Sequence, residues 1–126
     1  MELNSKIENA PGFLKHPDYS ITFESADHEI TANLQGKVIA QSEKTLILLE
    51  SNHRPVVYFP RGDVRMDLAH ETDKDSFCPF KGHASYYTVG EDANIAWSYE
   101  DPYAEMLSIK GYIAFYTDRL DQPLLP

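Results

Sequence analysis

Residues 29–40 read EITANLQGKVIA, and this stretch carries the pattern of a complete β-hairpin. Apolar and polar residues alternate from Glu29 to Leu34, which is the period of a strand that buries one face. Gln35 and Gly36 then favour a tight turn, and residues 37–40 return as the second strand. The stretch therefore predicts an antiparallel pair, and similar patterns extend outward from it in both directions.

Short strands separated by turn signals are predicted on both sides of this hairpin. They fall at residues 21–24, 45–50, 54–59, 81–89, 94–99 and 111–116. Residues 45–50 are rich in Leu and Ile but too short for a stable helix, so we expect a strand with residues 54–59 as its hairpin partner. Gly90, Glu91 and Asp92 favour the turn of another hairpin, between residues 81–89 and 94–99.

Brief helical turns and one polar loop interrupt the strands. Asp63 and Asp101 are the predicted caps of helical turns that run to about residues 68 and 107. Residues 70–76 are polar and predict a loop. Residues 1–15 show no sustained period, so we expect an N-terminal arm that gains order by docking, followed by a single domain over residues 16–126.

This spacing predicts an all-β, mainly antiparallel domain, built as a sandwich or an open barrel with one or two short helices. The chain has 126 residues, of which 42% are hydrophobic and 25% are charged, which is the balance of one globular domain. At this length about two-thirds of the surface of the extended chain can be buried, so a core needs neither a disulfide nor a metal.

The net charge and the single cysteine limit which partners and which cellular compartment we expect. Twenty acidic residues against eleven basic ones give a formal net charge of -9, which opposes a nucleic acid or an anionic membrane as the main partner. The single cysteine, Cys78, excludes an intramolecular disulfide. Residues 46–49, the longest apolar run, are far fewer than the ~20 that a membrane helix needs, and no signal peptide precedes them. We therefore expect a soluble cytoplasmic protein.

Five blocks of the sequence are similar to one family. They are residues 16–22 (HPDYSIT), 58–61 (YFPR), 78–87 (CPFKGHASYY), 97–103 (WSYEDPY) and 114–120 (AFYTDRL). On these blocks the chain resembles the family called domain of unknown function 427, which also carries a nucleotidyltransferase label. The resemblance covers roughly residues 16 to 121. It implies a β-tent-like fold, in which two small sheets meet and leave a cleft.

The resemblance implies little about chemistry, and the label finds no support in the residues. A nucleotidyltransferase holds magnesium at a triphosphate, but here no Gly-Ser is followed by a paired Asp-x-Asp or Asp-x-Glu. We therefore expect no cofactor, and an enzymatic activity stays open.

Aromatic residues are the first candidates for a ligand site. Trp97 and Tyr99 alternate on one predicted strand and so project to the same face, while Tyr58 lies on a strand that could pack opposite. Such rings could wall an apolar pocket for a small molecule. Tyr86 and Tyr87 cannot both face one side, so one of them is expected to reach solvent or a cleft. The alternative is that these rings are ordinary core.

Two cations are candidates for the polar part of that site. Lys81, between Phe80 and Gly82 at a strand entrance, could point into a cleft and meet an anionic group of a ligand. Arg61 could converge with it on a carboxylate or phosphate. The alternatives are a solvated lysine at the surface and an arginine that only pairs with Asp63.

A thiol enzyme is the second hypothesis, with Cys78 as its nucleophile. A nearby ammonium favours the thiolate, and His83, His70 or Glu50 could act as the base. The alternative is that Cys78 is a small buried hydrophobe. His70, Cys78 and His83 also leave a three-ligand metal site open, but the paired spacings of structural zinc sites do not occur, so we expect no metal.

The leading hypothesis is a domain that binds a small ligand in an aromatic-lined cleft, with Lys81 as its anchor. The thiol enzyme is the alternative. A third hypothesis is an interaction module that acts through a strand edge or through its N-terminal arm and forms a homodimer.

Overall fold

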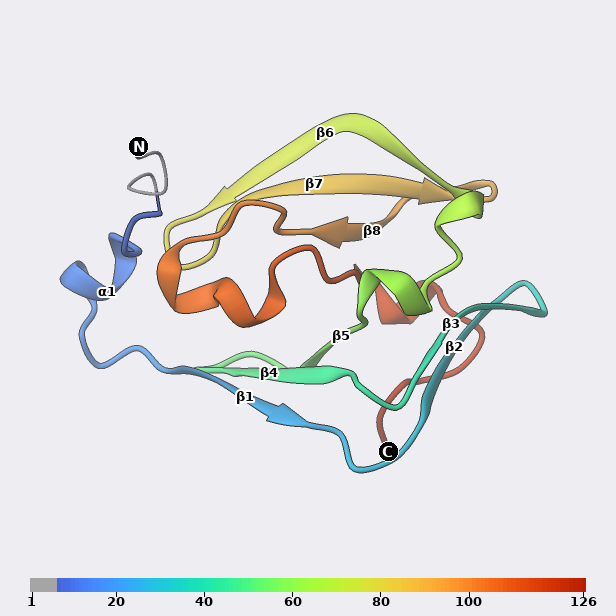
Figure 1. Cartoon of the computed structure of the whole chain (residues 1–126), viewed down its shortest axis with the longest axis horizontal. Helices are drawn as coiled ribbons and strands as arrows, with labels where there is room; N and C mark the ends of the chain where they lie inside the picture. Colours follow the sequence, from blue (N-terminus) through green and yellow to red (C-terminus); the bar gives the residue numbers. More distant parts are fainter. Residues whose placement is uncertain (1–6) are drawn as a thin grey trace.

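The computed structural model describes residues 7–126, which fold mainly into antiparallel strands (Figure 1). The predicted hairpin is confirmed: β2 (Ile30–Leu34) pairs with β3 (Lys37–Ser42). Its turn consists of Gln35 and Gly36, whose φ angles of 52° and 77° both lie in the left-handed region. Both central positions of a tight hairpin turn of this kind need a positive φ.

The remaining strands form two further sheets. One has the order β1 (Ile21–Ser25), β4 (Leu46–Glu50), β5 (Val56–Tyr58). The other has the order β6 (Ala69–Cys78), β7 (Gly82–Val89), β8 (Asp92–Ser98), β9 (Ala114–Phe115). Every strand pair is antiparallel. The all-β, mainly antiparallel fold class is confirmed, with the strands divided among three sheets where two were expected.

A short seam joins the two larger sheets. Phe59, directly after β5, donates its backbone N–H to the carbonyl of Ile113 at 2.8 Å, and Ile113 returns a bond of 2.8 Å. Away from this seam the sheets lie on opposite sides of η4 (Ala104–Ile109), as Figure 1 shows. Met106 and Ile109 of η4 are fully buried, so this turn fills the space between the sheets. The two sheets and η4 therefore form a filled wedge.

Alternation along β7 divides the core into two clusters. Ala84 and Tyr86 point into the cluster that fills the wedge, whereas Tyr87 and Val89 point into a second cluster under the β2–β3 hairpin. The prediction that Tyr86 and Tyr87 face opposite sides is confirmed. The expectation that one of them reaches solvent is wrong, because both faces of this sheet are covered and both residues are less than 10% exposed.

Helical turns occur where they were predicted, but their caps are different. The turn after β5 consists of η2 (Arg61–Asp63) and η3 (Met66–Leu68), and η4 follows Asp101 after two further residues. Neither Asp63 nor Asp101 caps a turn. The carboxylate of Asp63 instead accepts a hydrogen bond of 2.6 Å from the Ser42 hydroxyl. Two further short helices, α1 (Gly12–Lys15) and η5 (Thr117–Arg119), were not predicted.

The predicted loop at residues 70–76 is wrong, because β6 runs through it. This strand lies at the sheet edge and its residues are mostly exposed, so it lacks the apolar alternation that marks a strand. Its pairing with β7 also shifts register between Glu71 and Asp75. The polar sequence of an edge strand therefore resembles that of a loop.

Part of the predicted N-terminal arm packs against the domain. The backbone N–H of Ala104 donates to the carbonyl of Glu8 at 2.8 Å, and Ala10 is only 2% exposed. The arm was predicted over residues 1–15, and residues 1–6 lie outside the described residues. Within residues 7–126, no helix combines the length and the hydropathy that a membrane span requires.

We expect Phe59→Ala to lower the free energy of unfolding by about 3–5 kcal/mol, because it empties a fully buried site beside the seam. Phe77→Ala is the matched control, since the Phe77 side chain is half exposed, and it should cost less than about 1 kcal/mol. Urea denaturation measures both. Equal losses in the two variants would contradict the assignment of Phe59 to the core.

Candidate functional site

A buried ion pair lies at one end of the wedge. Glu50 is the last residue of β4 and Lys81 directly precedes β7, so the two sheets bring them together. The Lys81 Nζ atom is 2.7 Å from Oε1 of Glu50, and each side chain is only 10% exposed. Two of the predicted site residues therefore meet, although they are far apart in the sequence.

A tyrosine completes this cluster. The hydroxyl of Tyr19 donates a hydrogen bond to Oε2 of Glu50, and its ring stacks on Phe80 with centroids 4.2 Å apart and an interplanar angle of 17°. Burial and the adjacent Glu50 carboxylate raise the pKa of Tyr19 to about 12. Tyr19 therefore stays a protonated donor at neutral pH. We call Tyr19, Glu50 and Lys81 the Lys81 cluster.

The partners of Glu50 keep it ionised. Burial by itself would raise the pKa of this carboxyl, but hydrogen bonds from Lys81 and Tyr19, with the positive charge of Lys81, hold the pKa below its usual range. The Nε2 atom of His53 lies 3.8 Å from Oε2 of Glu50. A carboxylate whose pKa is lowered is a weaker general base, which disfavours the role of base in a thiol enzyme.

A concavity of about 400 Å³ borders the cluster. It is lined by Lys15, His16, Pro17, Asp18, Tyr19, Ser51 and Asn52. Tyr19 belongs both to this lining and to the Lys81 cluster, so it connects the ion pair with the concavity. Small-molecule sites commonly have volumes of roughly 300–1,000 Å³ and a few polar groups that fix the orientation of the ligand.

The predicted aromatic residues lie in the core. Tyr58, Tyr86 and Tyr99 are 2%, 7% and 8% exposed, and all three belong to the cluster that fills the wedge. Trp97 is half-buried, and its indole N–H donates to the hydroxyl of Tyr58 at 3.3 Å. Burial raises the pKa of both Tyr58 and Tyr99. The core alternative accounts for their positions, and their contact with a ligand stays a prediction.

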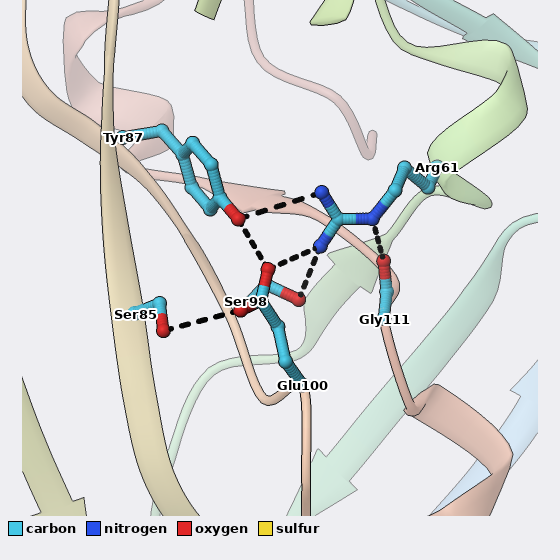
Figure 2. A network of polar contacts seen from close by, with 6 residues as sticks. All are labelled: Arg61, Ser85, Tyr87, Ser98, Glu100 and Gly111. Carbon is cyan, nitrogen blue, oxygen red and sulfur yellow. Dashed lines mark hydrogen bonds and ion pairs between the residues drawn. The ribbon is translucent and has the colours of Figure 1, made fainter. Parts of the chain in front are cut away.

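Arg61 does not converge with Lys81. Figure 2 shows its guanidinium in another network, where Nη2 donates to Glu100 at 2.7 Å and to Ser98 at 3.3 Å. Nε donates to the carbonyl of Gly111 at 3.1 Å. Of the interpretations left open for Arg61, convergence with Lys81 is not what the structure shows, because Arg61 pairs with Glu100 and Lys81 pairs with Glu50.

The hydroxyl of Tyr87 connects Arg61 with Glu100 in this network. The hydroxyl of Tyr87 donates to Glu100 and accepts from Nη1 of Arg61 at 3.4 Å (Figure 2). The Ser85 hydroxyl also donates to Glu100, at 3.4 Å. Burial would lower the pKa of Arg61, but Tyr87 and Glu100 raise it above its usual value. This network ties η2 to β7 and to the segment after β8.

The structure separates Cys78 from both of its predicted histidine partners. Cys78 lies opposite Gly82 and packs partly buried against the wedge cluster, while His83 is exposed on the other face beside Phe77. His70 lies eight positions from Cys78 along β6, which places it about 20 Å or more away. The structure therefore brings neither of the two candidate histidines together with Cys78. The three-ligand metal arrangement fails for the same reason.

Sequence reasoning missed several polar contacts of these clusters. Tyr19, Tyr87 and Glu100 all lie in blocks that carry the family resemblance, but their partners come from other parts of the chain. For Tyr19 and Glu100, block membership was the only signal. Among residues 7–126, no group of three or more His, Cys, Asp or Glu side chains is arranged to hold a metal ion.

The fold and the Lys81 cluster define a small antiparallel β domain with a buried lysine–glutamate pair beside a concavity. The chain belongs to the family described as Domain of unknown function (DUF427), whose model matches residues 22–124. The expected family is thereby confirmed, and the name of the model carries the nucleotidyltransferase label. A comparison with curated proteins finds no match.

We expect strong coupling between Lys81 and Glu50 in a double-mutant cycle. Lys81→Met should cost about 3–5 kcal/mol, because it leaves Glu50 charged and unpaired in a buried place. Adding Glu50→Gln removes that charge and should restore at least half of the loss. Lys37→Met, at an exposed position of β3, is the control. Losses that add within about 0.5 kcal/mol, measured by urea denaturation, would show that the pair is not coupled.

The lowered pKa of Glu50 also predicts how stability depends on pH. The unfolded chain, in which a Glu has a pKa near about 4.3, takes up the proton before the folded protein does. The stabilisation from the Glu50 charge is therefore complete above pH ~5 and is lost as the pH falls through the folded pKa.

The advantage of the wild type over Glu50→Gln should accordingly shrink as the pH falls from about 5 to about 3, in unfolding curves measured at each pH. Glu24→Gln, at an exposed position of β1, should show no such trend. A difference for Glu50→Gln that is constant over this range would contradict the shift.

Proposed function

We propose that this domain binds a small neutral ligand that offers both a hydrogen-bond acceptor and a donor, with Lys81 and Glu50 as its polar anchors. The observation that carries the proposal is the ion pair itself: 2.7 Å between Nζ and Oε1, with each side chain 10% exposed, beside a concavity of about 400 Å³. The proposal keeps Lys81 as the anchor and moves the site to the end of the wedge.

Stability alone is a weak explanation for why a fold would bury such an ion pair. Removing two charges from water costs several kcal/mol per ion, and well-packed apolar residues often stabilise a fold equally well. A buried ionisable pair beside a concavity is, by contrast, a common feature of ligand sites. The position of the Lys81 cluster at the end of the wedge, beside the concavity, favours binding over packing.

The charges of the site favour a neutral ligand. Glu50 is ionised and the chain carries a net charge of -9, so an anion approaching Lys81 is repelled. A cation approaching Glu50 meets the ammonium of Lys81. An amide avoids both penalties, because its carbonyl accepts from Lys81 while its N–H donates to Glu50. The anionic partner expected for Lys81 is already supplied by Glu50.

Three compounds that share a phenyl ring and differ in charge test this proposal: benzamide, benzoate and benzylammonium. Acetamide and isobutyramide extend the test to smaller amides. Each is titrated into the ¹⁵N-labelled protein, and backbone shifts are recorded together with the fluorescence of Trp97, which is the single tryptophan. We expect at least one amide to shift the signals of Tyr19, Ser51 and Gly82, and benzoate and benzylammonium to bind at least tenfold more weakly (about 1.4 kcal/mol).

Lys81→Met should abolish the localised shifts, whereas the control Lys37→Met should leave them unchanged. The folded state of each variant is checked by its amide spectrum before titration. The proposal fails if no amide produces a localised response, if benzoate binds as tightly as benzamide, or if the response persists in folded Lys81→Met.

A further inference from the structure

Residues 8–19 run across the end of the wedge, from the β6–β7 turn to the start of β1 (Figure 1). We call them the N-terminal strap. The family match begins at residue 22, so the strap lies outside the part of the chain that it covers. The strap includes α1 and supplies five of the seven residues that line the concavity.

Three hydrogen bonds, two to backbone groups and one to a side chain, hold the backbone in the first half of the strap. The N–H of Gly12 donates to the carbonyl of Pro79 at 2.9 Å, and the N–H of Ala10 donates to the carboxylate of Glu105 at 2.8 Å. The carbonyl of Glu8 accepts from Ala104 at 2.8 Å. Most other strap residues are exposed, and Leu14 is 85% exposed. A segment with few buried side chains opens locally at low cost.

The ring of Phe80 is an apolar contact for two residues of the strap. Phe13 meets its ring edge-on at 4.9 Å, and Tyr19 stacks on it at 4.2 Å. A Cβ atom built on Gly12 would lie 2.7 Å from two ring carbons of Phe80, so only glycine permits this approach. The Tyr19 ring on one face limits how far Phe80 can move away. A methyl group at position 12 would therefore force the Phe80 ring to shift.

The docked strap limits which molecules can reach Glu50 and Lys81. The hydroxyl of Tyr19 occupies Oε2 of Glu50, and Tyr19 stands between the ion pair and the concavity. Since both ion-pair side chains are only 10% exposed, a ligand needs a path to them. Movement of Tyr19 with the strap supplies that path.

We infer that the N-terminal strap is a gate, which opens by releasing Phe80 and Tyr19 and thereby controls access to the Lys81–Glu50 pair. This inference rests on the proposed function, because access to the pair matters only if a ligand binds there. Opening and access can nevertheless be measured without any ligand.

Gly12→Ala in the full chain tests the gate. The new methyl group should loosen the strap, so the amide of residue 12, whose N–H donates to the carbonyl of Pro79 in the wild type, should exchange its hydrogen at least tenfold faster relative to its intrinsic rate. Gly62→Ala is the matched control, because a Cβ there meets nothing within 4 Å and Gly62 lies outside the strap. The amide of Phe59 in the seam reports global unfolding and should not change in its exchange rate.

Access to Lys81 is measured in the same proteins by its initial rate of acetylation with an N-hydroxysuccinimide ester, mapped by mass spectrometry. Exposed Lys37 is the internal reference. In the wild type Lys81 should react at least tenfold more slowly than Lys37. In Gly12→Ala the rate at Lys81 should rise severalfold, with no change at Lys37 or in Gly62→Ala.

Phe80→Ala is a second way to release the strap, in case the ring adjusts to the methyl group. The gate is overturned if the strap amides exchange faster while Lys81 stays unreactive, or if neither Gly12→Ala nor Phe80→Ala frees the strap without global unfolding. If the strap opens and exposes Lys81 but no amide binds to the protein, only the proposed function is contradicted. Amide binding with unchanged access to Lys81 would contradict only the gate.

Discussion

The pair of backbone hydrogen bonds between Phe59 and Ile113 is the constraint on which the remaining structure depends. It joins β5 to the segment before β9, so the three-stranded and four-stranded sheets share one edge and must separate away from it. The space between them needs large side chains and an inserted turn. Tyr58, Tyr86 and η4 meet that need. Aromatic residues are therefore used for packing, and polar chemistry is left to the end of the wedge.

Two ion-paired carboxylates of this domain, Glu50 and Glu100, illustrate how burial decides how much an ion pair contributes to stability. Glu50 with Lys81 and Glu100 with Arg61 have the same separation of 2.7 Å, but their side chains are 10% and 38% exposed. Water screens the Arg61 pair, and exposed pairs contribute about 0–1 kcal/mol. Water screens the Lys81 pair much less, so breaking it should lower the free energy of unfolding by more. For the same reason, a ligand that reaches this pair should interact with it more strongly.

Local patterns in the sequence predicted the strands that bury one face, such as β2 and β3 with the turn at Gln35 and Gly36. They failed for β6, whose exposed polar residues carry no alternation, and for the caps, since Asp63 binds Ser42 instead of a backbone amide. Glu50 and Lys81 were each suspected from their places at strand ends. Their pairing was not predictable, because register between distant strands sets it. The same holds for Arg61 and Glu100.

The position of Tyr19 follows from the geometry of its neighbours. Phe80 lies in the turn between β6 and β7, next to Lys81, and it offers its ring where the chain enters β1. A stacked phenol at that place reaches Glu50 across the gap between the sheets. The hydroxyl uses the carboxylate oxygen that Lys81 leaves free, so every oxygen of Glu50 has a partner. A phenylalanine at position 19 would keep the stack but leave one buried oxygen with a poorer partner, which identifies the hydroxyl as the part that couples the strap to the ion pair.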